Sequence, residues 1–269
     1  MLVEVDTRTV QTSTVQCSNG MDAFLALPGT PGPRPSMVLL HERYGLVQHT
    51  KDLAMRFATE GYATIAPNLF FREPDQEAIA RGEARVALSD EQVCGAFPAA
   101  VEHLATASGA GSGQVVVMGV CATGRYPLVL AAERSDIAAC AVFYGGAGAP
   151  RAGQTPIEEV IAGSRVPVLG VFGEADHGIS IDAVLRFRGT LEVARRSHHV
   201  RIFPGAPHGF LNDTMPGRYR RQQAEDAWRL LGEFLARVRA GGFAEDRVQW
   251  TFEGDTSTDY DFSKNVRLE

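Results

Sequence analysis

The sequence predicts an α/β fold in which a mostly parallel central sheet carries helices on both faces. Three observations predict it: short continuous apolar runs recur along the chain, segments with helical spacing follow them, and neither a repeat nor an internal linker divides the chain. Apolar runs that alternate with helices are typical of parallel strands buried on both faces. A chain of 269 residues with 45% hydrophobic and 22% charged residues also has the composition of a globular domain rather than of a disordered one.

Six apolar runs are predicted to be the core strands, at residues 37–41, 62–66, 114–118, 137–144, 166–172 and 199–203. Helices are predicted over residues 50–61, 76–107, 127–134, 181–196 and 219–239. Thr50 is the predicted N-cap of the first helix and Gly61 its C-terminal stop, because these residue types favour those positions. The long segment 76–107 is rich in Ala and Glu, and Gly95 and Pro98 predict a break within it.

The two ends of the chain depart from this pattern. Residues 9–16 and 22–27 resemble short strands on either side of Asn19-Gly20, a strong hairpin signal, and predict an antiparallel edge. We expect residues 1–242 to form one domain and residues 243–269 to form a C-terminal extension of unknown role. Residues 247–252 alternate as a strand does, whereas residues 255–261 are polar and acidic. The tail is a packed appendage, an oligomer contact or a loose segment, and the sequence does not choose between a monomer and a homo-oligomer.

Charge and composition bear on the partners and the compartment. The net charge of −6 and the pI of about 5.7 give no basic footprint, so we expect no nucleic-acid partner. No apolar run reaches the roughly 20 residues that a membrane-spanning helix needs, and the N-terminus lacks the pattern of a secretory signal. Four cysteines without a Cys-x-x-Cys pair are typical of a reducing compartment, which predicts a cytoplasmic protein.

Three reactive side chains follow three predicted strands. Cys121 follows strand 114–118, Asp176 follows strand 166–172, and His208 follows strand 199–203. Because the carboxyl ends of parallel strands meet at one edge of a sheet, these groups are predicted to lie together. Each alone has an ordinary interpretation, as a buried core thiol, a loop acid or a structural histidine. The three required types at three suitable strand ends favour a site, and their order of nucleophile, acid and histidine matches a hydrolase triad.

The chemistry needs these residue types. A thiol becomes a strong nucleophile as the thiolate, and an imidazole can take its proton while a carboxylate holds the ring in the right tautomer. A sharp strand-to-helix turn would lift the sulfur of Cys121 out of the sheet near a helix N-terminus. Main-chain N–H groups at such a turn can stabilise an oxyanion.

Several segments together resemble the dienelactone hydrolases, or carboxymethylenebutenolidases, over roughly residues 20–238. The segments are His41-Glu42-Arg43-Tyr44-Gly45, Gly61-Tyr62-Ala63, Ala66-Pro67-Asn68-Leu69-Phe70, Gly119-Val120-Cys121, Phe143-Tyr144-Gly145-Gly146, Gly173-Glu174-Ala175-Asp176 and His208-Gly209-Phe210. The resemblance implies an α/β-hydrolase fold with a cysteine nucleophile.

The resemblance also implies a role for each matching residue. Cys121 would be the nucleophile, His208 the general base and then acid, and Asp176 the group that orients the imidazole. Glu42 would sit beside the thiol, partner the resting cysteine and help to generate the thiolate when substrate arrives. The main-chain N–H groups of Ala122 and Arg43 would form the oxyanion hole. The substrate-binding candidates are Tyr44, Arg81, Arg85, Tyr144 and Phe210.

Two positions depart from the family pattern. The family elbow has two glycines where this chain has Thr123-Gly124, which removes freedom of close approach between helix and strand. Founding members carry an arginine four residues after the catalytic histidine that helps to bind a substrate carboxylate, and here that position is Asn212. The arginines that could replace it are Arg43, Arg81, Arg85, Arg125 and Arg218.

The sequence therefore predicts a hydrolase that opens a small lactone, with dienelactone-type enol-lactones first, or cleaves a small ester through a thioester acyl-enzyme. No cofactor and no metal is expected. Two alternatives stay open: an esterase or thioesterase for other acyl substrates, and a non-catalytic relative that binds a small ligand.

Overall fold

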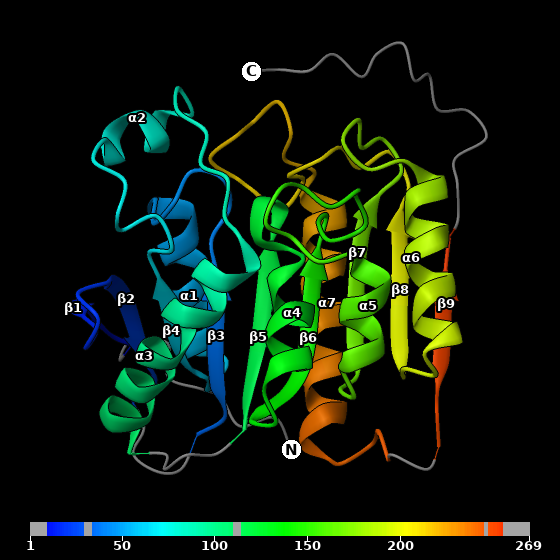
Figure 1. Cartoon of the computed structure of the whole chain (residues 1–269), viewed down its shortest axis with the longest axis horizontal. Helices are drawn as coiled ribbons and strands as arrows, with labels where there is room; N and C mark the ends of the chain where they lie inside the picture. The colour runs from blue at the N-terminus through cyan, green and yellow to red at the C-terminus, as the bar shows by residue number, and fades with distance from the viewer. Residues whose placement is uncertain (1–9, 30–33, 110–113, 245–246, 255–269) are drawn as a thin grey trace.

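A single mixed sheet organises the structure, which is a computed structural model describing residues 10–29, 34–109, 114–244 and 247–254. Within these residues nine strands follow the order β1-β2-β4-β3-β5-β6-β7-β8-β9 (Figure 1). The strands are β1 (Gln11–Gln16), β2 (Asp22–Leu27), β3 (Ser36–Leu40), β4 (Ala63–Pro67), β5 (Val115–Val120), β6 (Ile137–Phe143), β7 (Val168–Gly173), β8 (His198–Phe203) and β9 (Trp250–Glu253).

Strand directions confirm the mostly parallel sheet with an antiparallel N-terminal edge. Neighbouring strands from β4 through β9 pair in parallel, whereas β2 is antiparallel to both β1 and β4. The β1–β2 turn uses Asn19 and Gly20 as predicted: Gly20 has a φ of +80°, and the Asn19 side chain accepts a hydrogen bond from the Met21 N–H at 3.1 Å. A positive φ is a conformation that glycine adopts at little cost.

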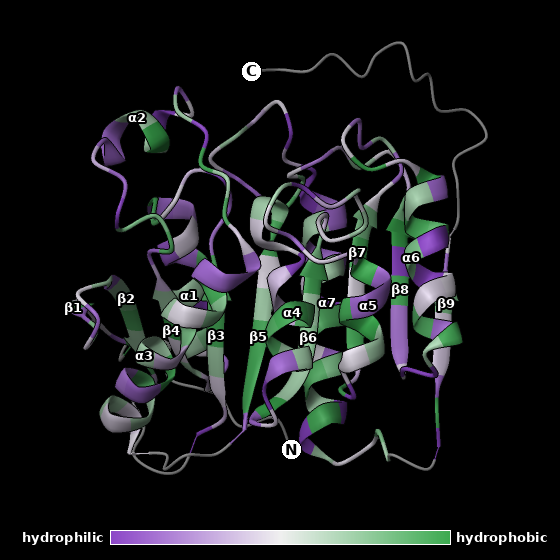
Figure 2. Ribbon diagram, in the orientation of Figure 1, coloured by the Kyte–Doolittle hydropathy of each residue, from purple (hydrophilic) through white to green (hydrophobic). Residues whose placement is uncertain are grey.

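Helices cover both faces of the sheet. They are α1 (Gln48–Thr59), α2 (Gln76–Arg81), α3 (Asp90–Ser108), α4 (Tyr126–Glu133), α5 (Ile157–Gly163), α6 (Ile181–Val193) and α7 (Arg221–Arg239). α1 and α7 pack on one face, where the rings of Phe57 and Trp228 lie 4.8 Å apart, and α3 to α6 pack on the other (Figure 1). Figure 2 shows hydrophobic residues along the central strands, as expected for strands covered on both sides.

The start of α1 differs from the prediction. α1 starts at Gln48, with Val47 as the N-cap residue, so the interpretation of Thr50 as the N-cap was wrong. Thr50 lies inside the first turn, where its hydroxyl donates to the Gly45 carbonyl at 3.2 Å. Gly61, with a φ of +91°, does follow the C-terminal end of this helix as predicted.

The helical segment 76–107 breaks elsewhere than expected. α2 ends at Gly82 in the left-handed conformation, and α3 starts after Ser89, whose side chain forms a capping box with Gln92. Gly95 and Pro98 both lie inside α3, so the predicted break near them was wrong. A left-handed glycine and a capping box are strong stop and start signals, and here they outweigh the single proline.

Two further elements complete the architecture: α5, which was not predicted, and β9, which matches the alternating pattern of residues 247–252. α5 has only seven residues after Pro156, too short for a periodic pattern to reveal it. β9 lies within the C-terminal extension and pairs in parallel with β8, which adds a strand at the far edge of the sheet. Residues 110–113 and the acidic stretch 255–261 lie outside the described residues. Among the helices described, none is both long and apolar enough to cross a membrane.

Candidate active site

Cys121 occupies a sharp turn between β5 and α4. It opens a short 3₁₀ turn, Cys121–Thr123, and has a φ of +56°, a conformation that costs energy in a residue other than glycine. The surrounding main chain is packed closely: a Cβ on Gly119 would meet the Thr123 carbonyl oxygen at 2.4 Å, and a Cβ on Gly124 would meet the Cα of Gly145 at 2.6 Å. The glycines at positions 119 and 124 therefore permit the turn that lifts the sulfur beyond the sheet edge.

The imidazole of His208 lies between a sulfur and a carboxylate. Its Nε2 is 3.0 Å from the Sγ of Cys121, and its Nδ1 is 2.7 Å from the Oδ2 of Asp176. The other carboxylate oxygen, Oδ1, accepts hydrogen bonds from the N–H groups of Gly178 at 2.7 Å and Ile179 at 3.0 Å. These two donors fix the carboxylate, and the carboxylate in turn fixes the tautomer with hydrogen on Nδ1, so that Nε2 faces the sulfur.

The surroundings of His208 favour its protonated form. Burial lowers the pKa of the imidazole, but hydrogen bonds to Asp176 and Cys121 and the negative charges of these two groups outweigh it, and they hold the pKa well above its ordinary value. A proton on Nε2 is stabilised by a thiolate 3.0 Å away and by the carboxylate behind the ring. The geometry can thus support a thiolate–imidazolium pair.

The other three cysteines lie in different surroundings. Burial raises the pKa of Cys17, raises that of Cys94 to about 11, and raises that of Cys140 still further. The Cys140 thiol donates to the Pro127 carbonyl oxygen at 3.1 Å and is fully buried. These thiols stay protonated near neutral pH, so their reactivity is expected to be low.

Glu42 has a buried carboxylate that is bound by two side chains. Its Oε2 accepts a hydrogen bond from the Nδ2 of Asn212 at 2.7 Å, and its Oε1 accepts one from the hydroxyl of Tyr144 at 3.4 Å. Burial, followed by the negative charges of Glu42 and Cys121, raises the pKa of Tyr144 well above its ordinary value, so this phenol stays a donor. Tyr144 also has a strained backbone, with a φ of +35°, directly after β6.

A second buried imidazole holds the loop that carries Glu42 and Arg43. The Nε2 of His41 accepts from the N–H of Leu69 at 3.0 Å, so its Nδ1 carries the hydrogen and donates to the Glu42 carbonyl at 2.7 Å. Burial lowers the pKa of His41 to about 4, although hydrogen bonds to the main chain oppose it, and the ring is neutral at physiological pH. His41 is therefore a structural support for the loop after β3.

The hydroxyl of Thr123 joins this loop to the cysteine turn. It accepts from the N–H of Val120 at 3.1 Å and donates to the carbonyl of His41 at 2.8 Å, and it is fully buried. Thr123 thus connects the two segments from which Ala122 and Arg43 project.

Replacing Thr123 with valine is expected to destabilise the fold by about 1–3 kcal/mol, because it leaves a buried N–H and a buried carbonyl without their partner. Thr123→Ser, which keeps the hydroxyl, is the matched control and should lose less. Urea unfolding of the three proteins measures the difference. Equal unfolding free energies of the valine variant and the natural protein would show that the hydrogen bonds of the Thr123 hydroxyl do not stabilise the fold.

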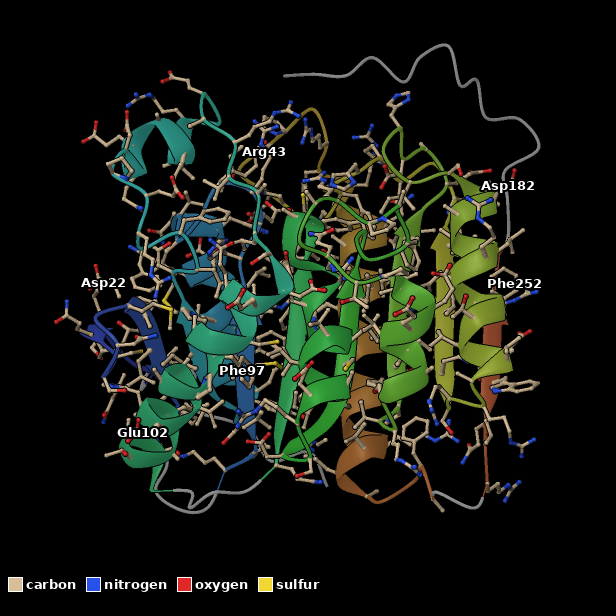
Figure 3. All side chains as sticks on the ribbon, viewed as in Figure 1. Asp22, Arg43, Phe97, Glu102, Asp182 and Phe252 are labelled. Carbon is tan, nitrogen blue, oxygen red and sulfur yellow. The ribbon has the colours of Figure 1, made fainter. Side chains whose placement is uncertain are left out.

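Two adjoining cavities lie beyond the carboxyl ends of the strands. One, of about 270 Å³, is lined by Cys121, His208, Ala122, Tyr144 and Gly145 among others, and the second, of about 600 Å³, is lined by Tyr44, Arg81 and Arg218 among others. Arg43 and Arg85 line both cavities. Figure 3 shows Arg43 beyond the strand ends, near the top of the view.

Phe210 and Arg125, two further candidates for substrate binding, differ in where their side chains lie. Phe210 is fully buried, packs its ring against Tyr144 and Phe203, and lines neither cavity. Arg125 lines the smaller cavity but is itself buried, with an ion pair to Asp90 at 2.9 Å. The structure therefore places Phe210 in the core and gives Arg125 a structural partner.

Comparison with known proteins identifies the family. The model of the dienelactone hydrolase family matches residues 21–239. The chain belongs to this family. Proteins of Methylorubrum extorquens and Escherichia coli K12, both named "Putative carboxymethylenebutenolidase", are 29% identical to it over 221 and 235 residues. These alignments cover 79% and 83% of this chain and 75% and 85% of the two relatives.

A solved structure agrees with the fold. The crystal structure of a "Putative Dienelactone Hydrolase" from Klebsiella pneumoniae aligns with a TM-score of 0.75 and 24% identity, over 86% of this chain and 98% of that one. As a member of the dienelactone hydrolase family, the chain is a hydrolase for small ester or lactone substrates. β9 lies outside the part that the family model matches.

Sequence reasoning missed how Asn212 is used in this dienelactone hydrolase family member. The position was interpreted only as the loss of a cation, whereas the structure places its amide on Glu42. The two residues are 170 positions apart, so no local pattern could have revealed the contact.

Proposed function

We propose that this protein opens small lactones and cleaves small esters through a Cys121-His208-Asp176 triad and a thioester acyl-enzyme. The observation that carries the proposal is the continuous chain from carboxylate to imidazole to sulfur, with distances of 2.7 and 3.0 Å. In nucleophilic catalysis the nucleophile needs a base within hydrogen-bond reach, and the base needs a group that orients it. His208 is the base for Cys121, and Asp176 orients His208. Family membership supports the reaction class.

In the first half-reaction, the thiol proton moves from Cys121 to the Nε2 of His208, and the thiolate attacks the carbonyl carbon of the substrate. A C–S bond forms, and the carbonyl π electrons move to oxygen. When the intermediate collapses, the C–O bond to the leaving oxygen breaks, and the Nε2 proton passes to that oxygen. In a lactone the leaving oxygen stays on the same molecule, and an enol-lactone eases this step because an enolate is a good leaving group.

In the second half-reaction, water replaces the leaving group. His208 takes a proton from water, whose oxygen attacks the thioester carbon, and the C–S bond breaks to release the carboxylic acid. Asp176 keeps the imidazole oriented in both halves and stabilises its positive charge. The sulfur and the imidazole return to their starting states, so the cycle consumes only the ester and one water.

The main-chain N–H groups of Ala122 and Arg43 are the proposed oxyanion hole. Both residues line the cavity that contains Cys121 and His208. Ala122 lies in the turn after β5 and Arg43 in the loop after β3, and the hydrogen bond from Thr123 to His41 joins these two segments. Fixed N–H donors of this kind stabilise the charge that develops on the carbonyl oxygen.

Arginines around the cavity support a substrate that carries negative charge. Arg43 and Arg85 line the cavity next to the sulfur, and Arg81 lines the adjoining one together with Tyr44. Arg81 is exposed and bound to Glu83, so its share in binding is expected to be smaller than that of Arg43. We therefore expect an ester or lactone with a carboxylate to be a better substrate than its neutral analogue.

The test combines a substrate panel with labelling of the thiols. The panel holds lactones and p-nitrophenyl esters, each with and without a carboxylate, and acyl thioesters. At pH 7 iodoacetamide should label Cys121 first, because a thiol such as Cys94 with a pKa of about 11 exists as thiolate in only about one molecule in 10⁴. Peptide mass spectrometry identifies the labelled cysteine, and the labelled protein should have lost its hydrolysis.

Two outcomes would overturn the proposal. One is full hydrolysis by protein whose Cys121 is completely alkylated. The other is a protein that hydrolyses no member of the panel, which would favour a relative that only binds a ligand. Preference for acyl thioesters over lactones would retain the triad and reassign the substrate.

A further inference from the structure

One buried carboxylate has no role in the proposed mechanism, although Tyr144, which donates to it, also interacts with the charge of Cys121. Glu42 is 4% exposed, and its carboxylate accepts from Asn212 and Tyr144 at 2.7 and 3.4 Å. Among the described residues, the side chain of Cys121 forms its hydrogen bond with His208 and not with Glu42. The family resemblance implies another resting arrangement, in which this carboxylate partners the cysteine until substrate arrives.

The orientation of Asn212 is fixed by its own neighbours. Its Oδ1 lies 3.1 Å from the main-chain N of Thr214 and 2.7 Å from the Thr214 hydroxyl. A main-chain N–H can only donate, so the amide oxygen must face Thr214 and the amide NH₂ must face Glu42. The side chain is 1% exposed, which leaves it little freedom to turn.

The second donor to Glu42 is fixed in the same way. The hydroxyl of Tyr144 accepts a hydrogen bond from the main-chain N–H of Leu211, so its own proton is directed to the carboxylate. Leu211 directly precedes Asn212, and the same stretch of chain therefore controls both donors. Each carboxylate oxygen of Glu42 already accepts a hydrogen bond. A further hydrogen bond from the thiol of Cys121 would therefore stabilise this carboxylate less.

We propose that Asn212 is a positioning residue that holds Glu42 away from Cys121, so that the sulfur is paired with His208 before any substrate binds. The inference rests on the proposed function in taking Cys121 as the nucleophile. In the free enzyme the S–H bond breaks and an N–H bond forms at Nε2, and nothing else is consumed. Substrate then meets a thiolate that needs no carboxylate on the substrate to activate it.

The charges around the sulfur explain why the position of Glu42 matters. His208 contacts the sulfur, the charge of Cys121 acts on Tyr144, and Asp176 acts through His208. The charged side chains that line the cavity are Arg43, Arg85, Arg125 and Arg151. A carboxylate released from Asn212 can move toward the sulfur, where it opposes the thiolate by like charge or takes up its proton in a hydrogen bond. Either change makes the thiol less reactive at low pH.

The test is the pH dependence of alkylation of Cys121 by iodoacetamide in the absence of substrate. The profile of the natural enzyme is the reference against which each variant is compared. Asn212→Ala should raise the midpoint by about one pH unit and slow alkylation at pH 6 by about tenfold. In a Glu42→Gln background, the same Asn212→Ala exchange should change the rate by less than about twofold, because its effect acts through Glu42.

Two further variants distinguish the proposed effect of Asn212 from a general loss of the folded structure. Asn212→Asp keeps the contact with Thr214 but places a carboxyl group against Glu42, and it should raise the midpoint as the alanine exchange does. Asp213→Ala alters the next residue, whose side chain is 62% exposed, and should leave the profile unchanged. Circular dichroism of each variant shows whether it is folded, and Asn212→Asp carries the test if the alanine variant is not.

The results separate this inference from the proposed function. Alkylation needs no turnover, so a shifted profile in a protein that hydrolyses no ester would support the inference and contradict the function. Hydrolysis through Cys121 with a profile that Asn212→Ala leaves unchanged would support the function and overturn the inference. An equal shift in the Glu42→Gln background would also overturn it, because Asn212 would then act by another route.

Discussion

Replacing Cys121 with alanine is expected to lower kcat/KM by about 10⁴-fold or more for each ester or lactone that the enzyme hydrolyses, because the proposed acyl-enzyme forms on this sulfur. The remaining activity would come from binding and from oxyanion stabilisation alone. The fold should survive, because the sulfur lies at the strand ends and a methyl group needs less space. Initial rates on the best substrate of the panel measure the effect.

Cys94→Ala is the matched control for this prediction. Cys94 is a half-buried cysteine of α3 that lines neither of the two cavities, so its loss should leave kcat/KM within about twofold. If Cys121→Ala retains more than a tenth of the natural activity while remaining folded, a water activated directly by His208 would have to be the nucleophile, and the acyl-enzyme would be abandoned.

Much of the fold was predictable because it depends on patterns that are local in sequence. The apolar runs that became β3 to β8 are continuous, and their residues are buried on both faces of the sheet. A continuous apolar run is typical of a parallel strand that helices cover on both sides. The hairpin at Asn19 and Gly20 was predictable for the same reason, since a two-residue signal decides it. α5 and the break at Gly82 were missed because short elements and caps compete with longer patterns around them.

The reactive side chains were predictable for a different reason. A parallel sheet brings its strand ends to one edge, so Cys121, Asp176 and His208 could be expected to meet without knowledge of any angle. The partners of Thr123 and Asn212 could not be expected in this way. Both side chains form hydrogen bonds to residues more than 80 positions away, and these bonds depend on loop conformations that no sequence pattern encodes.

Exchange of Asp176 for asparagine is expected to lower kcat by about 10³- to 10⁴-fold while leaving the protein folded. The asparagine can keep its oxygen toward the N–H groups of Gly178 and Ile179, which then presents its NH₂ to the Nδ1 of His208. The imidazole must carry its hydrogen on Nε2 to accept this bond, and in that tautomer it cannot take the thiol proton. Initial-rate kinetics on the same substrate measure the loss, and Asp182→Asn, an exposed aspartate at the start of α6 (Figure 3), is the control that should retain full activity.

The same exchange has a pH signature in stability. Because the folded pKa of His208 lies well above its ordinary value, largely through Asp176 and Cys121, protonation of this ring stabilises the folded state. That contribution is fully present below the unfolded pKa of about 6.5 and disappears as pH rises through the folded pKa. The difference in unfolding free energy between the natural protein and Asp176→Asn should therefore be larger at pH 6 than at pH 9. Urea unfolding at the two pH values measures it, and a difference that grows with pH would mean that His208 is neutral in the resting enzyme, with the sulfur still carrying its proton.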